Sequence, residues 1–105
     1  MKNMTDFNDF LESYTKLKDG FDKGLKFFIE SYHHDANGEP FSYVGCYPER
    51  VKLEYIKDHG FLILIITPET VFTFSEKKYT TNVSGRIVAF GSKHDDETHS
   101  LIEIG

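Results

Sequence analysis

Residues 61–67 constrain the fold more than any other part of the chain. They read Phe-Leu-Ile-Leu-Ile-Ile-Thr, with no charged side chain and no polar one before the threonine. The turn-forming residues Asp58, His59 and Gly60 precede this run, and Pro68 follows it. A short, continuously apolar, β-branched run with such boundaries is typical of a strand that is covered on both faces. The sequence therefore predicts a buried strand with another layer of material on each side.

The first third of the chain is predicted to be helical, over residues 5–33. Apolar side chains recur there at the spacing of one buried helix face, at Phe7, Phe10, Leu11, Tyr14, Leu17, Phe21, Leu25, Phe28, Ile29 and Tyr32. Gly20 and Gly24 each cost about 1 kcal/mol inside a helix. The segment is therefore one long helix or two helices broken near Gly20, and we favour two. A strand near residues 27–34 fits less well, because alternation fails at Phe27-Phe28-Ile29.

Residues 40–105 are predicted to be strand and turn. Asn37-Gly38 and Pro40 break the helical pattern. Strands are expected at 41–47, 51–55, 61–66, 71–75, 83–91 and 101–104, with 76–82 as a polar connector. Short connections imply antiparallel pairing. We expect a single α+β domain over residues 1–105, with a helix or helix pair on one face of a curved, mainly antiparallel sheet of about five to six strands.

This arrangement leaves one face of residues 61–66 without a cover. A helical layer buries only one side of a sheet. The second side then meets the sheet's own curled end, a bound ligand or another protein chain. Each of these three covers corresponds to a different function.

Charge and cysteine content exclude several classes of protein. The chain has 17 acidic and 12 basic residues and a formal net charge of −5, so direct binding to nucleic-acid phosphates is not expected. Its single cysteine, Cys46, cannot form an internal disulfide, which favours a cytoplasmic location. We expect no secretion signal, because the first eleven residues lack an apolar core. We also expect no membrane span, because such a span needs about 20 apolar residues.

Neither a metal site nor a catalytic site is predicted. The segment His33-His34-Asp35 and the segment from His94 to His99 carry ligand-type side chains, but neither has an established ligand spacing. Cys46 lies in a predicted strand, where a small buried residue is the ordinary explanation. The sequence therefore indicates no catalytic residue, no cofactor and no metal, and we expect a protein that is not an enzyme.

Two groups of side chains are candidates for binding a protein partner. The first is the acidic run Asp95, Asp96 and Glu97, which forms an anionic patch suited to a basic partner. Lys93 is the only basic residue among 92–105 besides histidine.

The second group consists of Tyr43, Tyr47 and Tyr55 on the predicted strands. Tyrosine is enriched at protein interfaces. These rings could also stack nucleic-acid bases, but that mode needs interleaved basic residues. The bases of the β region are matched by a similar number of acids, so contact with a protein is favoured.

Three functional hypotheses follow. The first is a small acidic protein-binding module that occludes a partner's basic or nucleic-acid-binding surface. Inhibitors and immunity or anti-defence proteins of phages and mobile elements act in this way. The comparison is with a functional class and not with a sequence motif. The second is a small-molecule-binding or catalytic domain with an aromatic pocket inside a curled sheet. The third is a self-associating structural protein, a homodimer formed through the second sheet face.

Overall fold

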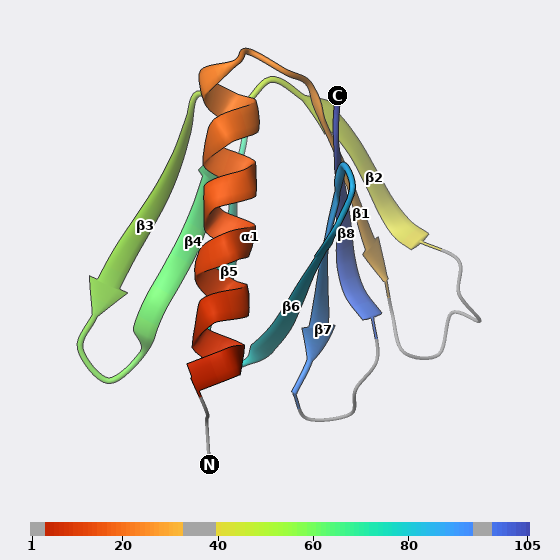
Figure 1. Ribbon diagram of the computed structural model, residues 1–105. Helices are drawn as coiled ribbons and strands as arrows, with labels where there is room; N and C mark the ends of the chain where they lie inside the picture. The colour runs from red at the N-terminus through yellow and green to blue at the C-terminus, as the bar shows by residue number, and fades with distance from the viewer. Residues whose placement is uncertain (1–3, 33–39, 94–97) are drawn as a thin grey trace.

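The computed structural model describes residues 4–32, 40–93 and 98–105, and within them the chain forms one helix and eight strands (Figure 1). The helix is α1 (Met4–Asp22), and the strands are β1 (Phe27–Tyr32), β2 (Pro40–Cys46), β3 (Arg50–Ile56), β4 (Gly60–Ile66), β5 (Val71–Ser75), β6 (Tyr79–Ser84), β7 (Ile87–Ser92) and β8 (Thr98–Ile104). Five strands pair in the order β2-β1-β8-β7-β6, and three pair in the order β3-β4-β5. All of these pairings are antiparallel.

The helix runs along the molecule with the three-stranded sheet on one side and the five-stranded sheet on the other (Figure 1). It contacts β3 of the first sheet and β6 and β7 of the second. The predicted α+β class with antiparallel pairing is confirmed. The prediction of a single curved sheet of about five to six strands is wrong, because the described strands divide into two open sheets, with β2 and β6 at the edges of one and β3 and β5 at the edges of the other. Neither sheet closes or curls strongly around its own face.

Helix α1 ends well before residue 33, so the predicted helical extent is wrong. Gly24 adopts a left-handed backbone with φ of 72°. The amide of Leu25 donates to the carbonyl of Gly20 at 3.0 Å, and the amide of Gly24 donates to the carbonyl of Phe21 at 3.0 Å. This pair of hydrogen bonds is the Schellman motif, which satisfies carbonyls at a helix end and turns the chain away. The segment predicted as two helices therefore forms one helix followed by a strand.

Strand β1 occupies a segment that the sequence pattern assigned to a helix. Phe27 and Ile29 are buried in the core, whereas Phe28 and Glu30 lie on the opposite face and are half-buried. The sequence of β1 does not alternate between apolar and polar residues, because Phe28 is apolar although it lies on the outer face. β1 pairs with β2 on one edge and with β8 on the other. These long-range pairings determine its conformation and override local helix preference.

The predicted connector at 76–82 contains most of a strand. β6 pairs with β7 through a tight hairpin in which Ser84 lies opposite Ile87, so the predicted strand at 83–91 is in fact the end of β6, a turn and most of β7. The strands predicted at 51–55, 61–66 and 71–75 are confirmed as β3, β4 and β5, with bounds that differ by no more than one residue.

One hydrophobic cluster joins the helix to both sheets. Its buried members are Phe10, Leu17, Phe27, Ile29, Val51, Ile63, Ile65, Phe74, Val88, Phe90, Ile102 and Ile104. The rings of Phe74 on β5 and Phe90 on β7 stack at a centroid distance of 3.9 Å and an angle of 10°. The inner face of β4 is therefore covered by α1 and by the five-stranded sheet.

The second face of β4 carries Leu62, Leu64 and Ile66. No described helix or strand lies over this outer face of the three-stranded sheet (Figure 1). Its neighbours on β3 are Glu54 opposite Leu62 and Lys52 opposite Leu64, and these two side chains form an ion pair of 2.7 Å. Leu62 is buried, and Leu64 and Ile66 are half-buried. Among the described elements, α1 and the five-stranded sheet cover one face of the strand, and none covers the other.

Candidate functional site

The outer face of the five-stranded sheet carries two large, exposed aromatic rings at its β2 edge. Tyr43 is 60% exposed and Tyr47 is 65% exposed. The ring of Tyr43 lies 6.3 Å from that of Phe28 on β1. Lys26 Nζ lies 5.3 Å from the Phe28 ring centroid and 5.9 Å from the Tyr47 ring centroid. We call Lys26, Phe28, Tyr43 and Tyr47 the tyrosine patch.

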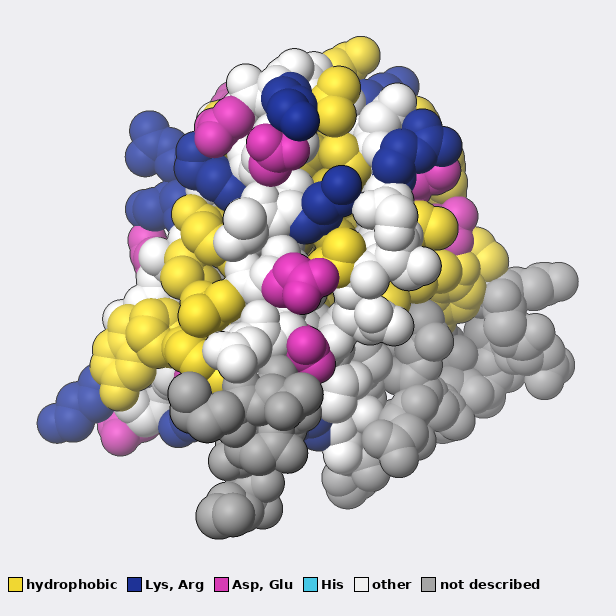
Figure 2. Space-filling view, in the orientation of Figure 1, with side chains coloured by type: hydrophobic (Ala, Val, Ile, Leu, Met, Phe, Trp, Pro, Cys, Tyr) yellow, Lys and Arg dark blue, Asp and Glu magenta, His cyan; other side chains and the backbone are white. Residues whose placement is uncertain are grey.

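Strand register explains why Phe28 and Tyr43 of the tyrosine patch share a face. Phe28 lies opposite Gly45, and Glu30 lies opposite Tyr43, so Phe28, Glu30, Tyr43 and Gly45 lie on the outer face. Lys26 and Tyr47 flank these strands, and the contacts of Lys26 with both rings join them to the patch. A Cβ atom at Gly45 would lie 3.2 Å from Lys26 Cε. The absence of a side chain at Gly45 therefore leaves room for the lysine stem to cross the sheet. In Figure 2, hydrophobic side chains also gather over the region of β2.

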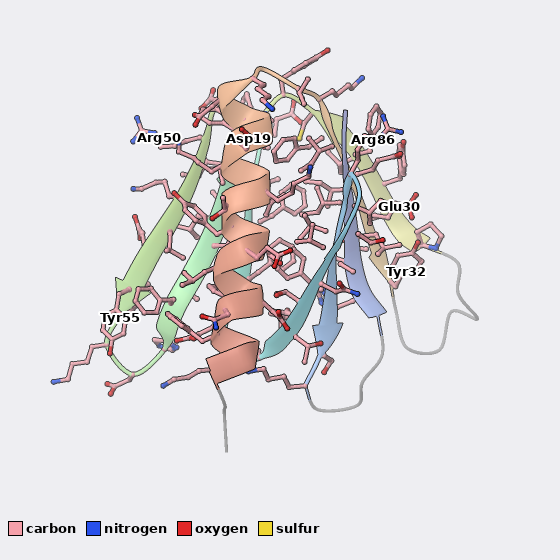
Figure 3. All side chains as sticks on the ribbon, in the orientation of Figure 1. Asp19, Glu30, Tyr32, Arg50, Tyr55 and Arg86 are labelled. Atoms are coloured by element: carbon pink, nitrogen blue, oxygen red, sulfur yellow. The ribbon has the colours of Figure 1, made fainter. Side chains whose placement is uncertain are left out.

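The third predicted contact residue, Tyr55, belongs to a different surface. It is 65% exposed but lies on β3, where its ring packs edge-on against Phe61 at 5.1 Å. Phe61 in turn contacts Phe7 of α1 at 5.6 Å. Figure 3 places Tyr55 beside the β3–β4 turn, across the molecule from Glu30 and Tyr32 of β1. The structure brings Tyr43 and Tyr47 together and leaves Tyr55 apart from them.

Glu30 and Tyr32 form a polar border beside the tyrosine patch. The Tyr32 hydroxyl donates a hydrogen bond to Glu30 Oε2. This hydrogen bond to a carboxylate raises the pKa of Tyr32, with burial and the negative charge adding to the effect. The phenol is therefore neutral, and a donor, across the physiological range.

Several predicted candidates lie outside the described residues. These are the acids Asp95, Asp96 and Glu97 and the segment His33-His34-Asp35. Within the described ranges, no three His, Cys, Asp or Glu side chains gather in a way that could hold a metal ion.

Cys46 is a free, half-buried thiol on the inner face of β2. Burial raises its pKa, and the positive charge of Lys26 offsets only part of that shift. A raised pKa keeps the thiol protonated at neutral pH, which does not favour the thiolate needed by a nucleophile.

A cavity of about 420 Å³ opens at the opposite edge of the five-stranded sheet from the tyrosine patch. Its lining residues are Lys77, Lys78, Tyr79, Ser92, Lys93 and His99. We call these six residues the lysine pocket. This pocket was not predicted from the sequence, because residues 76–82 have the polar composition of a connector. The signal was nevertheless present, since pairing of Tyr79 with Ser92 places Lys78 beside Lys93, whose amide donates to the Lys78 carbonyl at 3.0 Å.

Comparisons with known proteins supply no relative. No protein-family model, curated protein or solved structure gives a significant match to this chain. No helix in the described ranges combines the length and apolar character needed to cross a membrane. Functional conclusions therefore rest on the surfaces themselves.

Proposed function

We propose that this chain is a protein-binding module and that the tyrosine patch is part of its contact surface. The supporting observation is the pair of exposed rings, Tyr43 and Tyr47, on a sheet face over which no described element packs. Tyrosine rings supply large contact area with few rotatable bonds, and they are frequent among the residues that dominate binding energy. The neighbouring Lys26 and the Glu30–Tyr32 pair provide a polar rim.

The proposed partner presents a basic surface, and in the fullest form of the proposal that surface binds nucleic acid. The net charge of −5 and the acidic run Asp95, Asp96 and Glu97 support this choice. The chain would then act as an inhibitor or as an immunity or anti-defence protein in the cytoplasm, by occlusion and without a chemical reaction. The net charge supports a basic partner surface, and the tyrosine patch supports a protein contact.

The proposal is tested by capturing partners from lysate of the native cell with purified variants. Asn82 offers a matched control, because strand pairing places it on the same outer face as Tyr43, in the same row across the sheet. The double variant Tyr43→Ala/Tyr47→Ala is expected to weaken capture by about 30-fold or more, the effect of losing one or two dominant contacts. Asn82→Ala should leave capture unchanged. Equal capture by both variants would reject the tyrosine patch as the contact.

The basic partner surface has a separate test in the same assay. Conversion of Asp95, Asp96 and Glu97 to their amides should slow association and reduce its salt dependence, because rim charges act mainly on encounter rates. A captured partner whose binding is insensitive both to this variant and to high salt would contradict electrostatic occlusion while leaving the tyrosine contact intact.

Self-association is a second candidate, favoured by the outer face of the three-stranded sheet. Leu62, Leu64 and Ile66 lie there, and the exposed apolar residues Ile56 and Val71 extend the stripe at its edges. A stripe of this kind on both copies can form an isologous interface. Light scattering across a wide concentration range tests it, and a strict monomer would exclude it. The aromatic pocket of a curled sheet loses its premise, because neither sheet is strongly curled.

A further inference from the structure

The outer face of the three-stranded sheet presents two adjacent rows of side chains that run across the strands. Each row has a charged residue on β3, a leucine on β4 and a hydroxyl-bearing residue on β5. By strand pairing, the first row is Lys52, Leu64 and Thr73, and the second is Glu54, Leu62 and Ser75. The two rows therefore match in shape and polarity and differ mainly in the sign of the charge on β3.

Apolar surface lies in and around these rows. No described helix or strand covers this face (Figure 1). Leu64 at its centre is half-buried, and Val71 and Ile56 at its edges are 50% and 41% exposed. Removal of apolar surface from water is the main favourable contribution to most protein association. A second surface of similar shape and polarity therefore gains free energy by packing on this face.

The charges of this face favour a second copy of the chain over a basic partner. Strand pairing places two bases, Arg50 and Lys52, and one acid, Glu54, on the β3 part of the face. A basic protein surface would meet the two bases, and like charges in contact oppose binding. Two copies of this chain each carry a net charge of −5 and repel each other over most of their surfaces. This face is not acidic, so two copies can approach each other there with little repulsion.

Lys52 and Glu54 determine how the second copy is oriented. Within one copy, Lys52 Nζ lies 2.7 Å from Glu54 Oε1, and each side chain is 38% exposed. A two-fold axis that lies between the facing sheets and runs across the strands makes the two β3 strands antiparallel. When this axis passes midway between the two rows, Lys52 of each copy faces Glu54 of the other, and Leu64 faces Leu62. An axis on the first row would instead place Lys52 against Lys52, so the charges select the register between the copies.

We propose that two copies of the chain pack through the outer faces of their three-stranded sheets, in this antiparallel register, with Lys52 and Glu54 of both copies forming one network of alternating charges. This inference rests on self-association, the second candidate function, and is independent of the tyrosine patch. Three strands about 4.8 Å apart, with about 3.4 Å per residue, present a face of about 14 Å by 17 Å. Two such faces bury less than the roughly 1,200 Å² of a standard stable interface, so the dissociation constant should be on the order of 100 μM.

The test measures self-association of purified variants by light scattering, from about 10 μM to about 1 mM. Lys52→Glu alone and Glu54→Lys alone each place like charges opposite one another in the dimer. Each variant should therefore weaken self-association by at least about tenfold. An equimolar mixture of the two variants pairs every acid with a base again, so the mixture should associate within about threefold of the original affinity. The double variant Lys52→Glu/Glu54→Lys should also associate, because it exchanges the two charges.

Lys18→Glu is the matched control for Lys52→Glu. It makes the same change in net charge, also removes an ion pair from a side chain that is 38% exposed, and lies on α1. It should leave self-association within about twofold of the original. A chain that stays monomeric throughout would overturn the proposal together with self-association as a function. If the chain associates, but Lys52→Glu weakens association no more than Lys18→Glu or the mixture of variants stays monomeric, the proposal is overturned and self-association through another surface remains.

Discussion

Truncation on the two faces of β4 should have very different effects on stability. Ile63 points inward and is completely buried between α1 and the five-stranded sheet, whereas its neighbour Leu64 points outward and is half-buried. Each buried methyl or methylene group contributes about 0.8 kcal/mol. Together with the cavity left behind, Ile63→Ala should lower the free energy of unfolding by about 2–5 kcal/mol. Leu64→Ala, which removes a partly solvated side chain, should lower it by about 1 kcal/mol.

Urea unfolding followed by circular dichroism measures both values, and it should be run at low and at high protein concentration. The assignment of faces predicts that Ile63→Ala loses much more stability than Leu64→Ala at low concentration. Equal losses under these conditions would refute it. A midpoint that rises with protein concentration in the original chain, and no longer rises in Leu64→Ala, would show that a second copy covers the outer face.

Three further predictions concern single positions. Ser13→Ala should raise the free energy of unfolding by about 1 kcal/mol, measured in urea, because Ser13 Oγ is buried without a hydrogen-bond partner among the described residues. Gly24→Ala should lower it by about 1 kcal/mol because of the positive φ, whereas Gly24→Asn should lose less. Burial raises the pKa of Tyr79, so as the pH rises the unfolded chain loses this proton before the folded chain does. The contribution of the neutral phenol to the free energy of unfolding is complete below about pH 10 and is lost as the pH rises through the raised pKa. Urea unfolding at alkaline pH should show a shallower loss for Tyr79→Phe, and an identical slope would contradict this.

The region around β4 was predictable because local signals and tertiary structure agree there. The apolar run at 61–66 is bounded by turn residues, and the alternating pattern at 51–55 identifies its neighbour. Both became strands of the three-stranded sheet. The run predicted a layer over each face, and the structure places α1 and the five-stranded sheet over the inner face and no described helix or strand over the outer one. Which face the fold covers was not encoded locally, since it depends on where α1 and the five-stranded sheet pack.

The segment from Phe27 to Tyr32 shows why the remaining elements were harder to predict. Its apolar residues fit helix spacing as well as they fit a strand, and only pairing with β2 and β8 decides between the two. β8 lies some seventy residues away in the sequence, so a pattern of neighbouring residues does not reveal this pairing. The lysine pocket has the same origin, because Lys78 and Lys93 become neighbours only when β6 and β7 pair.

The central claim, that the exposed tyrosine face contacts another protein, has a direct test in site-specific photo-crosslinking. A photoreactive phenylalanine would replace Tyr43 in one variant and Asn82 in another, and both would be expressed in the native cell. The account predicts a covalent adduct with a different protein from position 43 and none from position 82. Equal adducts from both positions, or none from position 43, would contradict it.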